Sequence, residues 1–462
     1  HIIIKKLYYK KLLNIYTIQM TIYALSSGSG ISGIASIRIS GELTKNVVEK
    51  LTNSRIPKPR LATLKKINNI TTNELIDEGI IIWFPGPNSY TGEDMAELHV
   101  HGSVAVVKAI QNSIAEIDGC RIAEPGEFTK LAFLNKKINL QKAESIADLI
   151  SSETEIQRRQ AIKIMTGKTA ERFNSWRDGL VKILSNFEAK IDFPEEDLPE
   201  DILKDIKIKV NEIKNEIKKT LNDQKVGERI REGFKIAIVG PPNAGKSSLL
   251  NYLSNKEASI VSEIAGTTRD VIEVHLNING LPVIISDTAG IRNSKDEIEK
   301  KGIKLALQKA EDADLNIVII EPKSGHFTGF LKDLLNSKSI LVINKSDLGV
   351  DSIVPEFKRY APIYISIKNE KNLNSLITEI KNRLKNQFHN SENILITRER
   401  HRYNLEQCVE HLENFEEKNN SEEFDKASED LRLAIRNLGK ITGKVDVEEI
   451  LGSIFRDFCI GK

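Results

Sequence analysis

The residues with the clearest chemistry form the glycine-rich segment Gly240-Pro-Pro-Asn-Ala-Gly245-Lys246-Ser247. This segment follows an apolar run at residues 234–239 and precedes a stretch with helical apolar spacing. Glycines let the backbone wrap phosphate groups closely, and a helix N-terminus favours negative charge. The segment therefore predicts a nucleoside-phosphate site in which Lys246 contacts the β- and γ-phosphates and Ser247 binds Mg²⁺. The residues assigned to the phosphates are Asn243, Ala244, Gly245, Lys246, Ser247 and Ser248.

A second segment, Asn344-Lys-Ser-Asp347, follows the apolar run at residues 340–343 and predicts the base specificity. A carboxylate at Asp347 can accept hydrogen bonds from the N1–H and N2–H groups of guanine. Adenine offers no such pair, so the segment favours GTP over ATP. The residues assigned to the base site are Asn344, Lys345, Asp347, Ser366, Ile367 and Lys368.

Two further segments are typical of a γ-phosphate sensor. Asp287-Thr288-Ala289-Gly290 ends another strand pattern. Asp287 is expected to hold Mg²⁺ through water, and the N–H group of Gly290 is expected to face the γ-phosphate. In the loop at residues 266–270, Thr268 is the natural second hydroxyl ligand of Mg²⁺. Such a loop is ordered by the γ-phosphate and released after hydrolysis, and the set of motifs is typical of translation-factor-like GTPases.

The residue after this motif is Ile291, where Ras-like GTPases carry the glutamine that orients the attacking water. Isoleucine cannot orient water, so another group must supply the catalysis. Asn243 suggests which one, because GTPases with asparagine at this P-loop position hold K⁺ beside the phosphates. The alternative is that Asn243 only tolerates the backbone geometry of the loop.

Composition bounds the remaining possibilities. A chain of 462 residues suggests about three domains. Because 67 Lys and Arg oppose 65 Asp and Glu, the net charge of +2 excludes nucleic-acid binding by bulk charge but allows a local basic patch. The three cysteines are far apart, which argues against a disulfide scaffold or a Cys-rich zinc site and fits a reducing compartment. The sequence contains no run of about 18 or more apolar residues, so no membrane span is predicted.

Apolar periodicity predicts how the chain is organised. From residue 234 to about 387, strand and helix patterns alternate, which predicts a parallel, doubly wound sheet. Its expected strands are 234–239, 271–277, 283–286, 315–320, 340–343 and 363–365. Helical spacing flanks this α/β unit, and residues 20 to about 135 mix α and β, with strands at 21–27, 34–41 and 79–84. The predicted domains are an extension at 1–19 that is non-native or disordered, an N-terminal domain at 20–137, helical segments at 138–230 and 391–462, and the inserted α/β unit at 231–390.

Motifs outside this unit carry a closer resemblance. They lie at residues 91–102, 124–140 and 191–197, and the chain ends Phe458-Cys459-Ile-Gly-Lys462. From Met20 to the C-terminus, the chain resembles the MnmE (TrmE) family of tRNA uridine-modifying GTPases. The resemblance implies a multidomain α/β fold, with an N-terminal α+β folate-binding domain that dimerises, an all-α helical domain, and an inserted P-loop GTPase α/β domain.

The resemblance also implies a reaction and its partners. Family members act with a flavoprotein, MnmG, in a heterotetramer. Together they add an aminomethyl or carboxymethylaminomethyl group to C5 of the tRNA wobble uridine. A tetrahydrofolate derivative, 5-formyl or 5,10-methylene, supplies the one-carbon unit. A homodimer in the bacterial cytoplasm is expected.

Site residues carry over from the family by position. The implied folate residues are Arg38, Glu97, Lys137 and Lys462, and the implied K⁺ ligands are Asn243, Ser262, Ile264 and Thr267. Glu299 matches the glutamate that positions the attacking water, and Cys459 matches a cysteine needed for modification but not for hydrolysis. Judged without the family, Arg38, Glu97 and Lys137 are ordinary surface charges, and Glu299 is an exposed glutamate at a helix start.

Two alternative functions remain open. One is a ribosome-assembly or regulatory GTPase switch, which catalyses nothing beyond hydrolysis. Such switches commonly append an RNA-binding module with a G-x-x-G loop, and no such pattern follows residue 390. The other is a folate-dependent enzyme working alone, which leaves the GTPase unit unexplained.

Overall fold

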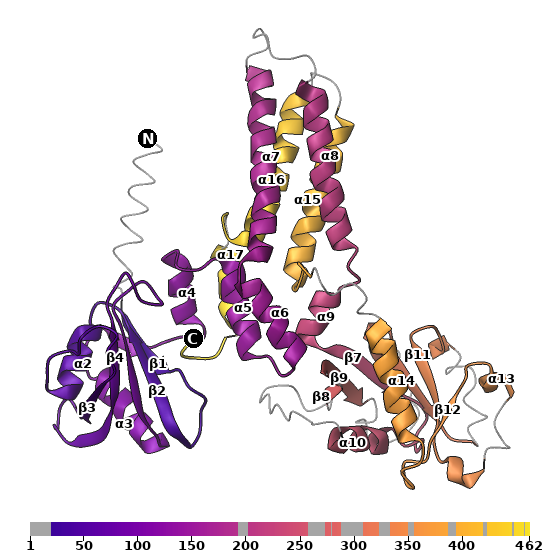
Figure 1. The fold of residues 1–462 in the computed structure, drawn as a ribbon, viewed down its shortest axis with the longest axis horizontal. Coiled ribbons are helices and arrows are strands. Elements are labelled where there is room, and N and C mark those ends of the chain that lie inside the picture. The colour runs from indigo at the N-terminus through magenta and orange to yellow at the C-terminus, as the bar shows by residue number, and fades with distance from the viewer. Residues whose placement is uncertain are drawn as a thin grey trace, which may run out of the picture. The chain divides into compact units, whose positions relative to one another are not determined.

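The structure, shown in Figure 1, is a computed structural model of the chain. It describes residues 20–192, 202–256, 273–278, 280–287, 308–322, 333–349, 355–386, 394–418, 423–445, 448–456 and 458–462. The expected extension at residues 1–19 lies outside the described residues. The chain forms two compact units, His1–Ala147 with Gly439–Lys462, and Asp148–Leu438. Within the described residues, no helix is long and apolar enough to cross a membrane.

The first unit is built on a six-stranded sheet with strand order β3-β4-β5-β2-β1-β6. Its strands are β1 (Thr21–Leu25), β2 (Ser32–Ser40), β3 (Thr63–Asn68), β4 (Leu75–Phe84), β5 (Met95–Gly102) and β6 (Cys120–Ile122). Helices α2 (Thr44–Thr52) and α3 (Val104–Ala115) pack on one face of the sheet. Because side chains alternate along a strand, Ile37 and Ile39 of β2 enter that core and Arg38 lies on the opposite face.

The C-terminal residues of the first unit pack beside helix α4 (Glu127–Leu134) and the start of α5 (Leu140–Ile150). Helix α17 (Glu448–Arg456) contributes Leu451 and Phe455 to an apolar cluster with Leu140. After it, Ile460 forms a β-bridge with Pro125. Gly461 has φ +94°, and a Cβ there would lie 2.1 Å from the backbone oxygen of Leu25, so the close approach of the tail requires glycine.

The second unit contains four long helices that run side by side in Figure 1: α7 (Lys168–Asp192), α8 (Ile202–Leu221), α15 (Glu399–Glu417) and α16 (Phe424–Thr442). Two shorter helices, α6 (Glu155–Met165) and α9 (Val226–Glu232), contact each other at the base of this bundle. The predicted helical spacing is confirmed, since Leu180 and Phe187 of α7 and Val210 and Ile217 of α8 are all buried.

A second six-stranded sheet, with order β12-β11-β10-β7-β9-β8, forms the α/β part of this unit. Its strands are β7 (Phe234–Val239), β8 (Glu273–Ile278), β9 (Leu281–Asp287), β10 (Leu315–Ile320), β11 (Ser339–Ile343) and β12 (Ile363–Tyr364). Helices α10 (Lys246–Lys256) and α14 (Leu373–Asn386) contribute to the core of this sheet. Two shorter helices are η2 (Ser346–Leu348) and α13 (Pro355–Lys358).

The expectation of an entirely parallel sheet is wrong for one strand. Five strands are parallel, but β8 pairs antiparallel with β9. Only two residues, Asn279 and Gly280, separate the paired residues Ile278 and Leu281. A parallel crossover needs about a dozen residues, so these strands must form a hairpin. The Asn-Gly pair at residues 279–280 is a strong two-residue hairpin signal in the sequence.

Candidate functional site

The P-loop joins the end of β7 to α10 along a tightly constrained path. A Cβ on Gly240 would lie 2.0 Å from the backbone oxygen of Ile319, and one on Gly245 would lie 2.3 Å from Nδ2 of Asn344. The backbone is left-handed at Asn243 (φ 62°) and Gly245 (φ 101°). Close packing and positive φ therefore require glycine at residue 245, where the loop turns into the helix.

Lys246 folds back over this loop. Its Nζ donates hydrogen bonds to the backbone oxygens of Gly240 (2.9 Å) and Pro241 (3.0 Å). These bonds hold the ammonium group within the P-loop. Ser247 and Ser248 follow in the first turn of α10 and are exposed, whereas Ala244 is buried. The structure thus gathers the phosphate-site residues of the sequence analysis on one loop and helix start.

Asn344 connects the P-loop to the base segment. Its Nδ2 donates to the backbone oxygen of Ala244 (2.8 Å), and its Oδ1 accepts from the backbone N–H of Ile367 (3.2 Å). The side chain is only 4% exposed, so both amide groups are used inside the protein. Sequence reasoning assigned Asn344 to the base. In the structure its amide links two segments about 100 residues apart in sequence, and its role beside the base stays a prediction.

Asp347 is exposed and lies in the short helix η2, four residues after the end of strand β11. The hydroxyl of Ser366 donates a hydrogen bond to its carboxylate, and this bond is the main reason why the pKa of Asp347 is lowered. A backbone hydrogen bond and, more weakly, the positive charges of Lys368 and Lys345 lower the pKa further, whereas desolvation raises it. A lowered pKa keeps Asp347 ionised at neutral pH, which is the form that accepts two hydrogen bonds.

Sequence reasoning missed one residue of this site. Nζ of Lys345 lies 2.6 Å from Oε2 of Glu321, the first residue after β10. Residues at the carboxyl ends of neighbouring parallel strands meet at one edge of the sheet, so the position of Glu321 directly after a strand was the available signal. The ion pair orients the Lys345 side chain beside the base segment.

Several predicted residues fall outside the described part of the chain. They are Ser262, Ile264, Thr267, Thr268, Thr288, Ala289, Gly290 and Glu299. The backbone of Asp287 is described: it ends β9 and pairs in register with Ile238 of β7, next to the P-loop. The expected roles of these residues stay predictions.

The first unit contains the pair Arg38 and Glu97. They face each other on β2 and β5, with Nη2 of Arg38 2.7 Å from Oε1 of Glu97. The Arg38 guanidinium also lies over the rings of Tyr90 (5.4 Å) and Phe128 (5.6 Å). An ion pair and two cation–π contacts fix its orientation. The positions of these two aromatic residues in the sequence do not reveal a stacking role.

The C-terminal tail lies in the same unit. The backbone oxygen of Cys459 accepts hydrogen bonds from the N–H groups of Gly126 (3.4 Å) and Lys462 (3.3 Å). The thiol of Cys459 is exposed and free. Burial raises the pKa of the Cys120 and Cys408 thiols, so Cys459 is the accessible thiol.

The four implied folate residues are only partly brought together. Lys137 is exposed just after α4, and Lys462 is half-buried at the end of the tail. Across the described residues, neither lysine makes a hydrogen bond or ion pair with Arg38 or Glu97. Arg38 and Glu97 therefore form a direct ion pair. Lys137 and Lys462 lie in the same unit, outside this ion pair.

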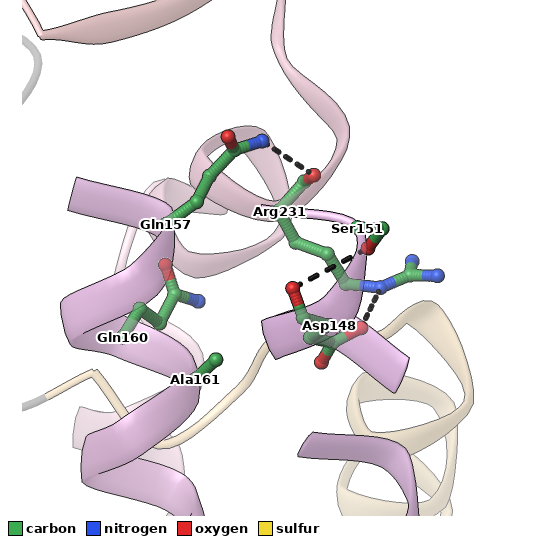
Figure 2. A pocket seen from close by; sticks show the side chains of 6 residues that line it. All are labelled: Asp148, Ser151, Gln157, Gln160, Ala161 and Arg231. Carbon is green, nitrogen blue, oxygen red and sulfur yellow. Dashed lines mark hydrogen bonds and ion pairs between the residues drawn. The ribbon is translucent and has the colours of Figure 1, made fainter. Parts of the chain in front are cut away.

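A polar junction lies where the chain passes between the helices and the α/β part of the second unit. Oδ1 of Asp148 lies 3.0 Å from Nε of Arg231, before β7 (Figure 2). The same oxygen lies 2.7 Å from Nη2 of Arg398, before α15. Nε2 of Gln157 donates to the backbone oxygen of Arg231 (3.2 Å). The Asp148 carboxylate therefore links the two segments through which the chain enters and leaves the α/β part of this unit.

We expect Asp148→Asn to destabilise this unit by about 2 kcal/mol, because it leaves two largely buried guanidinium groups without their shared charge. Asp148 is 13% exposed, so solvent compensates little. The urea midpoint of unfolding measures the effect. Asp178→Asn is the matched control: its carboxylate is 58% exposed and pairs with Arg177, so we expect a loss below about 0.5 kcal/mol. Equal midpoints for the two variants would contradict the junction's role.

Two family models and full-length relatives match this chain. Residues 140–459 match the MnmE helical domain, and residues 21–137 match the GTP-binding protein TrmE N-terminus. A tRNA modification GTPase MnmE of Pelagibacter ubique is 69% identical over 443 residues, which are 96% of this chain and 100% of that protein. A tRNA modification GTPase MnmE of Rickettsia bellii is 45% identical over 446 residues, which cover 96% of this chain and 100% of that protein.

Solved structures of GTP-binding proteins also match. Era of Aquifex aeolicus bound to GDP·AlF4⁻ is 34% identical, over 32% of this chain and 55% of that one, with a TM-score of 0.25. The family assignment rests on the two domain matches and on the full-length relatives. With its P-loop and base segment, this chain belongs to the MnmE (TrmE) family and is a GTP-hydrolysing enzyme.

Proposed function

We propose that this chain is a tRNA modification GTPase that couples GTP hydrolysis to one-carbon chemistry on the wobble uridine. The observation that carries the proposal is the docking of the tail in the first unit. Gly461 packs against Leu25 of β1, whose neighbour Ala24 pairs in register with Arg38. The accessible thiol of Cys459 lies two residues from this contact, in the unit that also holds the Arg38–Glu97 ion pair. A GTPase switch without such chemistry has no need of this arrangement.

The GTP site does its work by positioning charge. Backbone N–H groups of the P-loop and the ammonium of Lys246 stabilise the β- and γ-phosphates, and Asp347 selects guanine. Ser247 and Thr268 would hold Mg²⁺, which neutralises phosphate charge when bound. Asn243, exposed and left-handed, would hold K⁺ with Ser262, Ile264 and Thr267. Glu299 would orient the attacking water.

The first unit offers groups that fit a tetrahydrofolate derivative. A carboxylate such as Glu97 can accept two hydrogen bonds from a pterin edge, and Arg38, Lys137 and Lys462 can meet carboxylates. Cys459 would act as nucleophile or as acid and base beside it. We propose further that the chain works as a cytoplasmic homodimer, with a flavoprotein MnmG and with tRNA.

The test is the nucleoside content of tRNA from cells that lack this protein. We expect wild type to restore C5-aminomethyl-type wobble uridines and Cys459→Ser to restore none, measured by mass spectrometry. In the described part of the chain, the hydrogen bonds of Cys459 are made by its backbone, so we expect the variant to keep its fold and its GTP hydrolysis.

The neighbouring variant Ile460→Val is the control, because it alters an exposed side chain of the same tail and leaves the thiol in place. We expect it to restore the modification fully. Full restoration by Cys459→Ser would remove this cysteine from the reaction. Failure of wild type to change any nucleoside, with GTP hydrolysis intact, would favour the regulatory switch.

A further inference from the structure

We infer that Glu321 is a positioning residue of the base site: its carboxylate holds the ammonium group of Lys345 away from Asp347, so that the Asp347 carboxylate stays open to guanine. Glu321 lies outside the nucleotide motifs of the sequence. It follows β10, whereas Lys345 and Asp347 follow β11. This role of Glu321 deepens the proposed function and rests on it, because it requires that Asp347 selects guanine.

Parallel pairing brings the ends of the two strands together. Ile320, the last residue of β10, is in register with Ile343, the last residue of β11. The backbone N–H of Asn344 donates to the backbone oxygen of Ile320 (2.8 Å), which extends the pairing beyond the end of β11. Glu321 and Lys345 come directly after this bond, so both residues lie at the carboxyl edge of the sheet.

The same edge carries the P-loop. A Cβ on Gly240 would lie 2.0 Å from the backbone oxygen of Ile319, two residues before Glu321. Asn344, next to the other member of the ion pair, donates to the backbone oxygen of Ala244 in the P-loop. The ion pair is therefore flanked by contacts that join the phosphate segment to the base segment, where its arrangement can affect a bound nucleotide.

Two carboxylates attract the ammonium group of Lys345. Its Nζ lies 2.6 Å from Oε2 of Glu321, and both side chains are about one-third exposed, at 35% and 32%. A hydrogen bond from Ser366 is the main cause of the lowered pKa of Asp347, and the charge of Lys345 contributes more weakly, so these two groups also attract each other. Within the described residues, Lys345 forms its ion pair with Glu321 and none with Asp347.

The choice between the two carboxylates matters for the base. A hydrogen bond from an ammonium group to a carboxylate is stronger than one from a neutral N–H group. Lys345 on the Asp347 carboxylate would therefore compete with the N1–H and N2–H groups of guanine. The backbone of Lys345 is left-handed (φ 58°), a conformation that is uncommon outside glycine and concentrates at functional sites. The surrounding structure, and not local preference, thus sets the start of this side chain.

The test measures the Kd of the full chain for GTP by equilibrium binding. Glu321→Gln keeps the size of the side chain and removes its charge. We expect Kd to rise about five- to tenfold, because the released ammonium group competes for Asp347, and the rise to shrink at high salt, which screens an exposed ion pair. The hydrolysis rate at saturating GTP should stay unchanged, since occupied sites react as in wild type.

Two double variants show whether Glu321 acts through Lys345 and Asp347. Lys345→Met keeps the apolar stem and removes the ammonium group, so adding Glu321→Gln should change the Kd for GTP by less than about twofold. Asp347→Asn leaves no carboxylate there for Lys345 to meet. Adding Glu321→Gln to it should change the Kd for xanthosine triphosphate (XTP), whose base can pair with the new amide, by less than about twofold. A merely structural role would weaken binding in both backgrounds as much as in wild type.

Glu379→Gln is the matched control. The Glu379 carboxylate is 37% exposed and lies 2.8 Å from Nε of Arg383 on α14, in the same α/β part. Its loss removes the same charge from a comparable ion pair, and we expect the Kd for GTP to stay within about twofold of wild type. An unchanged Kd in Glu321→Gln overturns the positioning role, and so does an equal rise in the wild-type, Lys345→Met and Asp347→Asn backgrounds.

Asp347→Asn alone separates this role from the proposed function. If Asp347→Asn weakens GTP binding and Glu321→Gln does not, the positioning role of Glu321 fails and the proposed reading of guanine stands. If Asp347→Asn binds GTP as tightly as wild type, the proposed reading of guanine fails, and the role of Glu321 falls with it.

Discussion

Asp347→Asn is expected to exchange the base preference of the enzyme from guanine to xanthine. The ionised carboxylate accepts from the N1–H and N2–H groups of guanine, and an amide can accept only one of these bonds and turns its NH₂ toward a second donor. Xanthine has a carbonyl in place of the amino group, so the amide can donate to it. We expect GTP affinity to fall by about two to four orders of magnitude. XTP affinity should rise by a comparable factor.

Nucleotide Kd values and hydrolysis rates for GTP and XTP check this result. Asp312→Asn is the control, because Asp312 is an exposed carboxylate of the same α/β part, outside the site. It should leave both affinities unchanged. If Asp347→Asn kept GTP affinity within a few-fold of wild type, the base would be read by other groups.

Gly245→Ala is expected to abolish tight GTP binding. The added Cβ would lie 2.3 Å from Nδ2 of Asn344, which is held by its bonds to Ala244 and Ile367. Neither side can retreat without breaking the link between the P-loop and the base segment. The left-handed φ of 101° adds about 1 to 2 kcal/mol of backbone strain. We expect nucleotide affinity to fall by at least about 100-fold, measured by equilibrium binding.

Gly280→Ala is the control that distinguishes backbone strain from a steric collision of the added Cβ. Gly280 also has a positive φ, of 86°, but a Cβ there meets nothing within 4 Å. The control should therefore lose about 1 to 2 kcal/mol of stability and keep its nucleotide affinity. Comparable affinities for the two variants would show that the approach of Asn344 to the P-loop is not needed for binding.

Local patterns carried much of the fold. The strands predicted at 234–239 and 315–320 begin and end as expected, because apolar runs bounded by turn residues report directly on a buried parallel strand. The predicted parallel direction of β8 is wrong, although the Asn-Gly pair before β9 favours an antiparallel hairpin. The extent of β12, two residues instead of three, was also missed. Short pairings depend on a neighbouring strand that the local pattern does not contain.

By itself, the sequence determined the chemistry that the molecule can offer: a P-loop, a carboxylate that can pair with guanine, a thiol near the C-terminus and the resemblance to the MnmE family. It determined these because each depends on residue type and short spacing. Only the tertiary structure decided which distant groups meet. Asn344 reaches Ala244, Tyr90 and Phe128 enclose Arg38, and Glu321 pairs with Lys345. Such contacts arise from the packing of whole elements, and packing depends on shape and register across the core, which no local spacing encodes.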